Sequence, residues 1–194
     1  MNLVIENILD LIDEYGEEDV TTILSGFSCP KNPDIENFLK NDSVLFAKKK
    51  QSVTYLISDA DDGSILGYFT LAIKVLQVKQ DAVSSKTLRK RFERFSKLDN
   101  NGMYVVPAFL LAQLGKNYAV DKGKRININN LMQQVYLITD EIQHLIGGSL
   151  IYLDVEKDND KLIKKYDDNC GYRPFGKRYS SSDGKSYLMM LKVL

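Results

Sequence analysis

The sequence predicts one α/β domain over residues 1–194, in which a mixed, mostly antiparallel sheet of six or seven strands is flanked by helices. Runs of β-branched and aromatic residues predict hairpins within 53–73 and 173–193, and a strand–helix–strand crossover lies between 105 and 155. Apolar residues at helical spacing before position 50 predict helices, including an N-terminal helical segment over 1–26. Together these features favour a sheet layer between two helical layers.

Helical patterns open the chain. Leu3–Ile12 carries apolar residues at roughly helical spacing, and Gly16 ends the run. A short helix is expected over Glu18–Leu24. A third helix is expected over Pro33–Lys49, because proline suits the first turn of a helix.

The pattern then changes to that of strands. Val53–Ser58 and Ser64–Ile73 are β-branched and aromatic, with a turn-rich connection between them. Ser84 and Ser85 are expected to cap a helix that ends near Ser96. The rest of the chain is predicted to form, in order, a strand (Val105–Leu114), a polar stretch (Lys116–Asn127), a helix (Asn129–Leu145), a strand (Ser149–Val155), a helix (Asn159–Asn169) and a hairpin (Arg173–Tyr179 with Ser186–Val193).

Composition and charge exclude several classes of protein. Lys plus Arg and Asp plus Glu both number 26, so the basic surplus that is typical of nucleic-acid-binding proteins is absent. The acidic N-terminus does not fit a signal peptide, and no apolar run is long enough for a membrane span, so we expect a soluble, cytoplasmic protein without a membrane partner. Cys29 and Cys170 form neither a disulfide framework nor a metal-ligand spacing, and no metal is expected.

The polar loop before the 129–145 helix is the first candidate site. It follows a buried strand and opens a helix, where unpaired backbone N–H groups and the helix dipole attract phosphate. Lys122, Lys124 and Arg125 add positive charge. A solvated basic loop explains the same residues equally well, and the glycine–lysine pattern of a P-loop is absent.

The helix that begins at Asn159 is the second candidate site. Leu162, Ile163 and Tyr166 share one helical face, so Tyr166 considered alone is explained as a core aromatic residue. A basic segment, 86–97, holds six basic residues and one acid, Glu93. It is explained as a solvated helix face, or as a contact for a ribose phosphate or an acidic partner. His144, the single histidine, is best explained as structural.

The order of these motifs resembles the GNAT superfamily of N-acetyltransferases. Asn159, Leu162 and Tyr166 stand where the family shows Asn-x-x-Ala-x-x-Phe/Leu-Tyr, and Gly171-Tyr172 is similar to the Gly-Phe that follows. The spacing to Gly171 is one residue longer than usual. Three upstream segments are similar to a bacterial branch found in mobile elements, which includes toxins of toxin–antitoxin pairs: Phe27–Cys29, Ile35–Leu39 and Gly67–Leu71.

The resemblance implies a GNAT-like three-layer fold that binds acetyl-coenzyme A as cosubstrate and transfers the acetyl group directly to a primary amine. Tyr166 would protonate the leaving thiolate. Glu156 would act as the base, with Asp154 or a water as alternatives. The family's phosphate loop carries two late glycines that are replaced here. The expected cofactor-binding residues are Leu111, Gln113, Leu114, Gly115, Lys116, Lys122, Gly123, Lys124, Arg125, Ile126, Asn127 and Asn159.

Three functions follow from this resemblance. The first is an acetyltransferase acting on an amine acceptor that the sequence does not identify. The second is a toxin-like enzyme that acetylates aminoacyl-tRNA, the one nucleic acid that stays open as a partner. The third is a non-catalytic binding module that keeps the fold. A homodimer is also left open.

Overall fold

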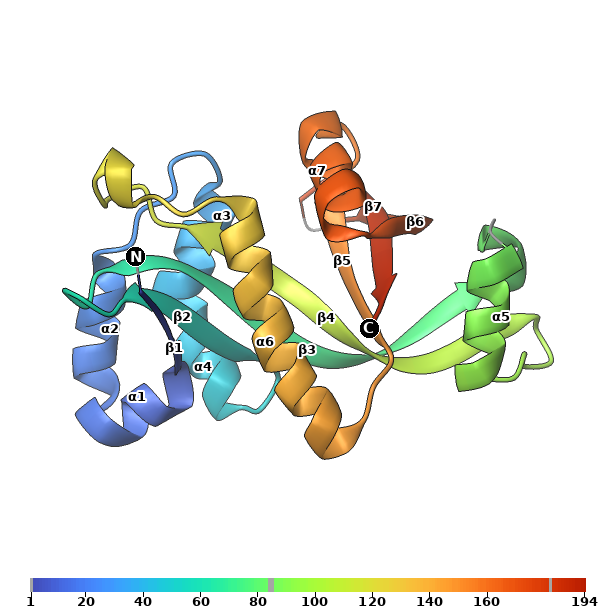
Figure 1. Cartoon of the computed structure of the whole chain (residues 1–194), viewed down its shortest axis with the longest axis horizontal. Helices are drawn as coiled ribbons and strands as arrows, with labels where there is room; N and C mark the ends of the chain where they lie inside the picture. The colour runs from blue at the N-terminus through green and yellow to red at the C-terminus, as the bar shows by residue number, and fades with distance from the viewer. Residues whose placement is uncertain (1, 84–85, 182) are drawn as a thin grey trace. The chain divides into compact units, whose positions relative to one another are not determined.

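The computed structural model describes residues 2–83, 86–181 and 183–194 (Figure 1). The predicted caps Ser84 and Ser85 lie outside the described residues. The chain divides into two compact units. Unit 1 comprises the chain up to Ala72 together with Leu111–Asp140, and unit 2 comprises Ile73–Leu110 and Glu141–Leu194.

The described residues form a seven-stranded sheet in the order β1-β2-β3-β4-β5-β7-β6. Its β4–β5 pair is parallel, whereas β1–β2, β2–β3, β5–β7 and β6–β7 are antiparallel. The mixed, mostly antiparallel sheet predicted from the sequence is therefore confirmed. The strands are β1 (Leu3–Asn7), β2 (Val53–Asp59), β3 (Ile65–Lys79), β4 (Met103–Lys116), β5 (Leu150–Glu156), β6 (Arg173–Ser180) and β7 (Lys185–Val193).

Helices account for most of the remaining chain. The predicted 33–49 helix is interrupted by a π-helical turn at Phe38–Asp42, and short 3₁₀ turns occupy Gln80–Ala82 and Lys122–Lys124. The α-helices are α1 (Ile8–Tyr15), α2 (Glu17–Ser25), α3 (Pro33–Asn37), α4 (Ser43–Lys48), α5 (Lys86–Phe95), α6 (Ile128–Ile146) and α7 (Asp160–Cys170).

The first helix is shorter than the sequence predicts, because Leu3–Asn7 is strand β1. These five residues pair antiparallel with β2, from Leu3↔Asp59 to Asn7↔Tyr55. The side-chain oxygen of Asn7 then accepts a hydrogen bond from the Leu9 N–H at 2.9 Å and caps α1. A short apolar run fits either period, and here pairing with a neighbouring strand decides the structure.

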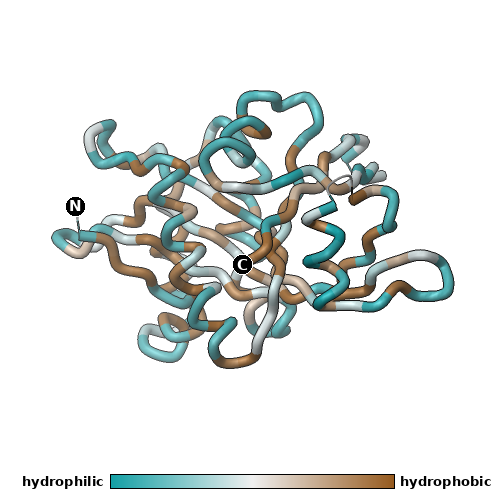
Figure 2. Tube along the Cα trace, turned by 45° about the vertical axis from the view of Figure 1, so that its right-hand side comes forward, coloured by the Kyte–Doolittle hydropathy of each residue, from teal (hydrophilic) through white to brown (hydrophobic). Residues whose placement is uncertain are grey.

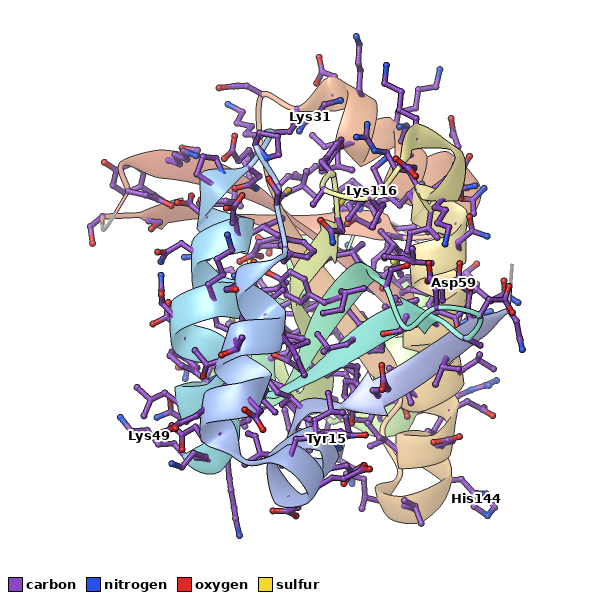
Figure 3. The ribbon with its side chains drawn as sticks, turned by 90° about the vertical axis from the view of Figure 1, so that its left-hand side faces the viewer. Tyr15, Lys31, Lys49, Asp59, Lys116 and His144 are labelled. Atoms are coloured by element: carbon purple, nitrogen blue, oxygen red, sulfur yellow. The ribbon has the colours of Figure 1, made fainter. Side chains whose placement is uncertain are left out.

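Unit 1 is layered. Figure 3 shows α1, α2 and α4 on one side of β1, β2 and the start of β3, with α6 on the other side. The core under the N-terminal helices is built around fully buried aromatic residues, and Phe27 packs edge-on against Tyr68 at 5.3 Å. The buried residues of this cluster are Ile8, Leu11, Val20, Leu24, Phe27, Cys29, Leu39, Ala47, Leu56 and Tyr68.

Unit 2 has its own core. The fully buried Phe92 of α5 lies 5.3 Å from the ring of Tyr104 on β4, and both join the aliphatic residues of the strands. Figure 2 shows hydrophobic colour along the strands and hydrophilic colour on the loops. The buried residues of this cluster are Leu76, Val78, Val83, Phe92, Tyr104, Val106, Ala108, Leu150, Tyr152, Phe175 and Leu191.

Candidate active site

The segment 111–116 at the end of β4 holds the first group of predicted cofactor-binding residues. Within the described residues, β4 and β5 pair at Phe109↔Ile151 and Leu110↔Tyr152. The segment that follows lies outside this pairing, so its backbone groups on that edge are not used by β5. Leu111 and Gly115 are buried, whereas Gln113, Leu114 and Lys116 are partly exposed.

Gly115 is required by packing. A Cβ at this position would lie 2.6 Å from both Ile35 Cγ2 and Tyr68 Cε1. A Cβ at Gly67 on β3 would in turn lie 2.7 Å from the Gly115 carbonyl oxygen. The two strands approach so closely that neither position accommodates a side chain. Gly115 therefore shapes the end of β4, while its role toward a cofactor stays a prediction.

Asn117, which is not among the residues predicted from the sequence, fixes the loop that leaves β4. Its side-chain oxygen accepts hydrogen bonds from the N–H groups of Ser28 at 3.0 Å and Ala119 at 2.9 Å. Its amide nitrogen donates to the Ile65 carbonyl at 2.7 Å, and the residue is buried. A buried amide with all these bonds satisfied ties the loop to two other segments. The one feature of the sequence that could have indicated this role is the position of Asn117, directly after a predicted buried strand.

Arg125 is engaged with its own loop. Its Nε donates to the Val120 carbonyl at 3.2 Å and its Nη2 to the Tyr118 carbonyl at 2.7 Å. The guanidinium also lies over the Tyr118 ring, 5.2 Å from the centroid. Arg125 thus closes the 118–125 loop, and its remaining N–H groups are those that a phosphate would use.

Lys124 is tied to the β2–β3 hairpin rather than left facing solvent. Its Nζ lies 3.4 Å from Asp59 Oδ2 and forms a shorter ion pair with Asp62. The hydrogen bond from Lys124 is the main cause that lowers the pKa of Asp62 to about 2, and the same bond raises the pKa of Lys124. Lys122 and Gly123 are exposed, and a Cβ at Gly123 would contact nothing within 4 Å.

Backbone N–H groups at the start of α6, which we expected to be unpaired, are hydrogen-bonded to asparagine side chains. The side-chain oxygen of Asn127 accepts from the N–H groups of Asn129 at 2.8 Å and Asn130 at 3.1 Å. The Asn130 side chain returns a bond to the Asn127 N–H at 3.2 Å. This reciprocal pair is a capping box built from two asparagines. The adjacent predicted residue, Ile126, is buried.

Asn159 and Tyr166 lie in unit 2. The Asn159 side chain caps α7 by accepting from the Leu162 N–H at 3.2 Å. Tyr166 is 6% exposed, and its ring packs edge-on against Tyr172 at 5.7 Å. α7 continues through Cys170, and the Gly171 N–H then donates to the Tyr166 carbonyl five residues earlier, where a regular α-helix has four. Gly171 adopts the left-handed conformation (φ 74°), and the Tyr172 N–H donates to the Tyr166 carbonyl at 3.0 Å.

Two carboxylates stand near the end of β5. Glu156 is exposed and pairs with Lys185, with 2.5 Å between Oε1 and Nζ. Asp154 is less exposed, and its Oδ2 accepts from Arg178 at 2.9 Å (Nε) and 2.8 Å (Nη2). Burial, and secondarily the Asp154 charge, raises the pKa of Tyr152, which lies on the same face of β5. Both candidate bases are therefore ion-paired.

The other conspicuous residues offer no alternative chemistry. Cys29 and Cys170 are buried and are not joined in a disulfide, and burial raises the pKa of both thiols, so neither is an activated nucleophile. His144 is exposed in the last turn of α6. In the described ranges, no group of three or more His, Cys, Asp or Glu residues could hold a metal ion, and no helix is long and apolar enough to cross a membrane.

No family model and no curated protein matches this chain. Solved structures do match it over nearly its whole length. AtaT complexed with acetyl-methionyl-tRNAfMet is 17% identical, with a TM-score of 0.64 over 96% of this chain and 94% of that chain. A tyrosine-to-phenylalanine mutant of KacT is 17% identical, with a TM-score of 0.64 over 100% of this chain and 95% of that chain. AtaTR bound with AcCoA is 15% identical, with a TM-score of 0.59 over 99% of this chain and 93% of that chain. The expected fold is therefore confirmed: this chain has the GNAT-like fold of the AtaT and KacT structures.

Proposed function

We propose that this protein is an N-acetyltransferase that moves the acetyl group of acetyl-coenzyme A to a primary amine by direct transfer. The observation that carries the proposal is the likeness over 96–100% of the chain to AtaT complexed with acetyl-methionyl-tRNAfMet, to KacT, and to AtaTR bound with AcCoA. The parallel β4–β5 pairing, which stops at Leu110 and Tyr152, supports it, because the following backbone groups on β4 are then available to a cosubstrate.

The residues of each unit would have different tasks. In unit 1, segment 111–116 would hydrogen-bond the pantetheine arm through its backbone. The 122–127 loop, closed by Arg125, would approach the pyrophosphate with Lys122 and the N–H groups that the capping box leaves unused. In unit 2, Asn159 would position α7, and Tyr166 would supply the acid.

In the proposed reaction the amine nitrogen forms a bond to the thioester carbonyl carbon and the carbon–sulfur bond breaks. The Tyr166 phenol donates its proton to the departing thiolate, and Glu156 takes the proton that the amine loses. A phenol suits this task, because its reference pKa of about 10 keeps it protonated at neutral pH. The Glu156 carboxylate is exposed, so that a substrate amine could reach it, and it is ion-paired with Lys185.

Tyr166→Phe tests this mechanism. The substitution keeps the edge-on packing against Tyr172, so the free energy of unfolding should change by only about 1 kcal/mol for one lost hydrogen bond. Turnover should fall by about 10²–10⁴-fold while acetyl-coenzyme A still binds. Tyr179→Phe is the matched control, because Tyr179 is 67% exposed, and it should keep full activity. Full activity of Tyr166→Phe would remove this tyrosine from the mechanism.

A second candidate, supported by α5, is that the amine belongs to an aminoacyl-tRNA. One face of this helix is buried through Phe92, and the other exposes Lys86, Lys90, Arg91 and Arg94. Among the described residues none of these cations forms an ion pair, so the face can neutralise phosphates. One of the similar structures is AtaT complexed with acetyl-methionyl-tRNAfMet.

Transfer of radiolabelled acetyl groups to charged tRNA, compared with transfer to small amines and peptides, separates the two acceptor classes. The tRNA acceptor is supported if the unmutated protein labels charged tRNA and an Arg91→Gln/Arg94→Gln variant does not. Expression of the unmutated protein should then also arrest growth. Transfer to small amines alone would exclude it. Acetyl-coenzyme A binding without transfer to any acceptor would favour the non-catalytic module instead.

A further inference from the structure

Strand β1 forms one edge of the sheet (Figure 3), and β6 forms the other. An edge strand presents backbone N–H and C=O groups with which a further strand can pair. β6 carries features that hinder such pairing, namely Pro174, Lys177 and a register shift between Pro174 and Gly176. β1 has none of them: its sequence is Leu-Val-Ile-Glu-Asn, and it pairs with β2 without a shift. The edge at β1 is therefore the less protected of the two.

The register of β1 on β2 shows which backbone groups point outward. In an antiparallel pair, alternate residues bond to the neighbouring strand, and the residues between them direct their N–H and C=O groups away from it. The Ala60 N–H donates to the Asn2 carbonyl at 2.8 Å, so these two residues form a hydrogen-bonded pair. The same register continues along the whole of β1. The even-numbered residues of β1 therefore bond to β2, whereas Leu3 and Ile5 direct their backbone groups outward.

The outward groups of Leu3 and Ile5 are not used by the described part of the chain. None of the turn, loop or cap hydrogen bonds among residues 2–83, 86–181 and 183–194 includes them. Val4, which lies between them, exposes 41% of its surface. Glu6, the one charged residue in the sequence of β1, accepts a hydrogen bond from the Ser58 hydroxyl at 2.6 Å. The edge thus offers two donors, two acceptors and an exposed apolar side chain.

Two copies of β1 fit each other in antiparallel orientation about a two-fold axis at Val4. Leu3 then lies opposite the partner's Ile5, and Ile5 lies opposite the partner's Leu3. Both are hydrogen-bonded pairs, so four N–H···O=C bonds satisfy all the outward groups of the two strands. Val4 lies opposite the partner's Val4 in a non-hydrogen-bonded pair, where the Cα atoms approach to about 4.5 Å and side chains pack closely.

We propose that the edge at β1 is an interface between two copies of this chain, whose sheets join there into one continuous sheet. A two-fold contact requires a surface that is complementary to itself. The register about Val4 meets this requirement, because it pairs every outward donor with an acceptor and buries the exposed valines against each other. It also sets no like charges opposite one another, since Glu6 lies opposite the partner's Asn2. The pairing is independent of the proposed acetyl transfer.

Sedimentation equilibrium of the full chain over a series of concentrations tests the interface. Val4→Glu and Val4→Lys each set two like charges opposite one another at the axis, so each should weaken dimerisation by about 10-fold or more. An equimolar mixture of the two variants sets opposite charges there and should restore the dimer. Val75→Glu is the matched control, because Val75 on β3 is also an exposed strand valine (67%), and it should dimerise like the unmutated protein.

Each outcome decides the proposal. Dimers that are lost in both single variants and regained in their mixture would establish that residue 4 faces itself across the axis, and regained pairing also shows that both variants are folded. An unmutated protein that stays monomeric at every concentration would overturn the interface. A dimer that Val4→Glu leaves unchanged, or that Val75→Glu weakens equally, would place the contact elsewhere. Variants that fail to associate even when mixed would contradict the register about Val4.

Discussion

Gly115→Ala tests the close packing that shapes the end of β4. The added methyl group would lie 2.6 Å from Ile35 Cγ2 and Tyr68 Cε1, whereas carbon atoms prefer about 3.5–4.0 Å. Neither neighbour can easily move. Tyr68 is fully buried, its hydroxyl donates to the Ile35 carbonyl at 2.6 Å, and its ring packs against Phe27.

Overpacking of this kind lowers the free energy of unfolding by about 1–3 kcal/mol. Replacing glycine by alanine also reduces the conformational entropy of the unfolded chain, which raises the free energy of unfolding by about 0.4–1 kcal/mol. We therefore expect a net loss of about 1–2 kcal/mol in the free energy of unfolding. Urea denaturation should show a midpoint lowered by about 0.5–1 M at an m-value of ~2 kcal/mol/M. Gly123→Ala is the control, because its methyl group meets open space, and it should be neutral or slightly stabilising. A Gly115→Ala protein as stable as this control would refute the reasoning.

Two further predictions concern ionisation. Asp62→Asn should lower the urea midpoint at neutral pH by removing the carboxylate that Lys124 binds. Because the pKa of Asp62 is lowered from 3.8 to about 2 in the folded chain, its contribution is present above pH 3.8 and is lost as the pH falls towards 2. The two proteins should then converge, and a difference that persists at pH 2 would contradict the assignment. Cys29 and Cys170 are buried with raised thiol pKa values, so Ellman's reagent should label them rapidly only in denaturant. Rapid labelling of the folded protein would contradict their burial.

The sheet was largely predictable because its signals are local. The hairpins are predicted by runs of β-branched residues joined by turn-rich connections. The crossover between 105 and 155 is predicted by two apolar strand patterns that flank a long segment with helical periodicity. Strand β1 was missed because Leu3–Asn7 fits a helix as well as a strand. Its identity depends on pairing with β2, some 50 residues away.

The site was predictable in residue type but not in contacts. The basic character of the 122–125 loop is visible in the sequence, yet its partners are distant: Asp59 and Asp62 for Lys124, and backbone carbonyls for Arg125. The capping box at the start of α6 has the usual three-residue spacing, but asparagine stands at both positions instead of the common Ser or Thr and Glu or Gln.

Calorimetric titration of the protein with acetyl-coenzyme A and with coenzyme A tests the central claim most directly. We expect saturable binding of both ligands. Arg125→Ala should weaken the binding of acetyl-coenzyme A by about 1–3 kcal/mol. The substitution removes the proposed charge-assisted contact to phosphate and also the two hydrogen bonds from Arg125 that close the 118–125 loop. Absence of detectable heat with the unmutated protein at millimolar acetyl-coenzyme A would contradict the proposed acetyltransferase and leave a GNAT-like fold that serves another purpose.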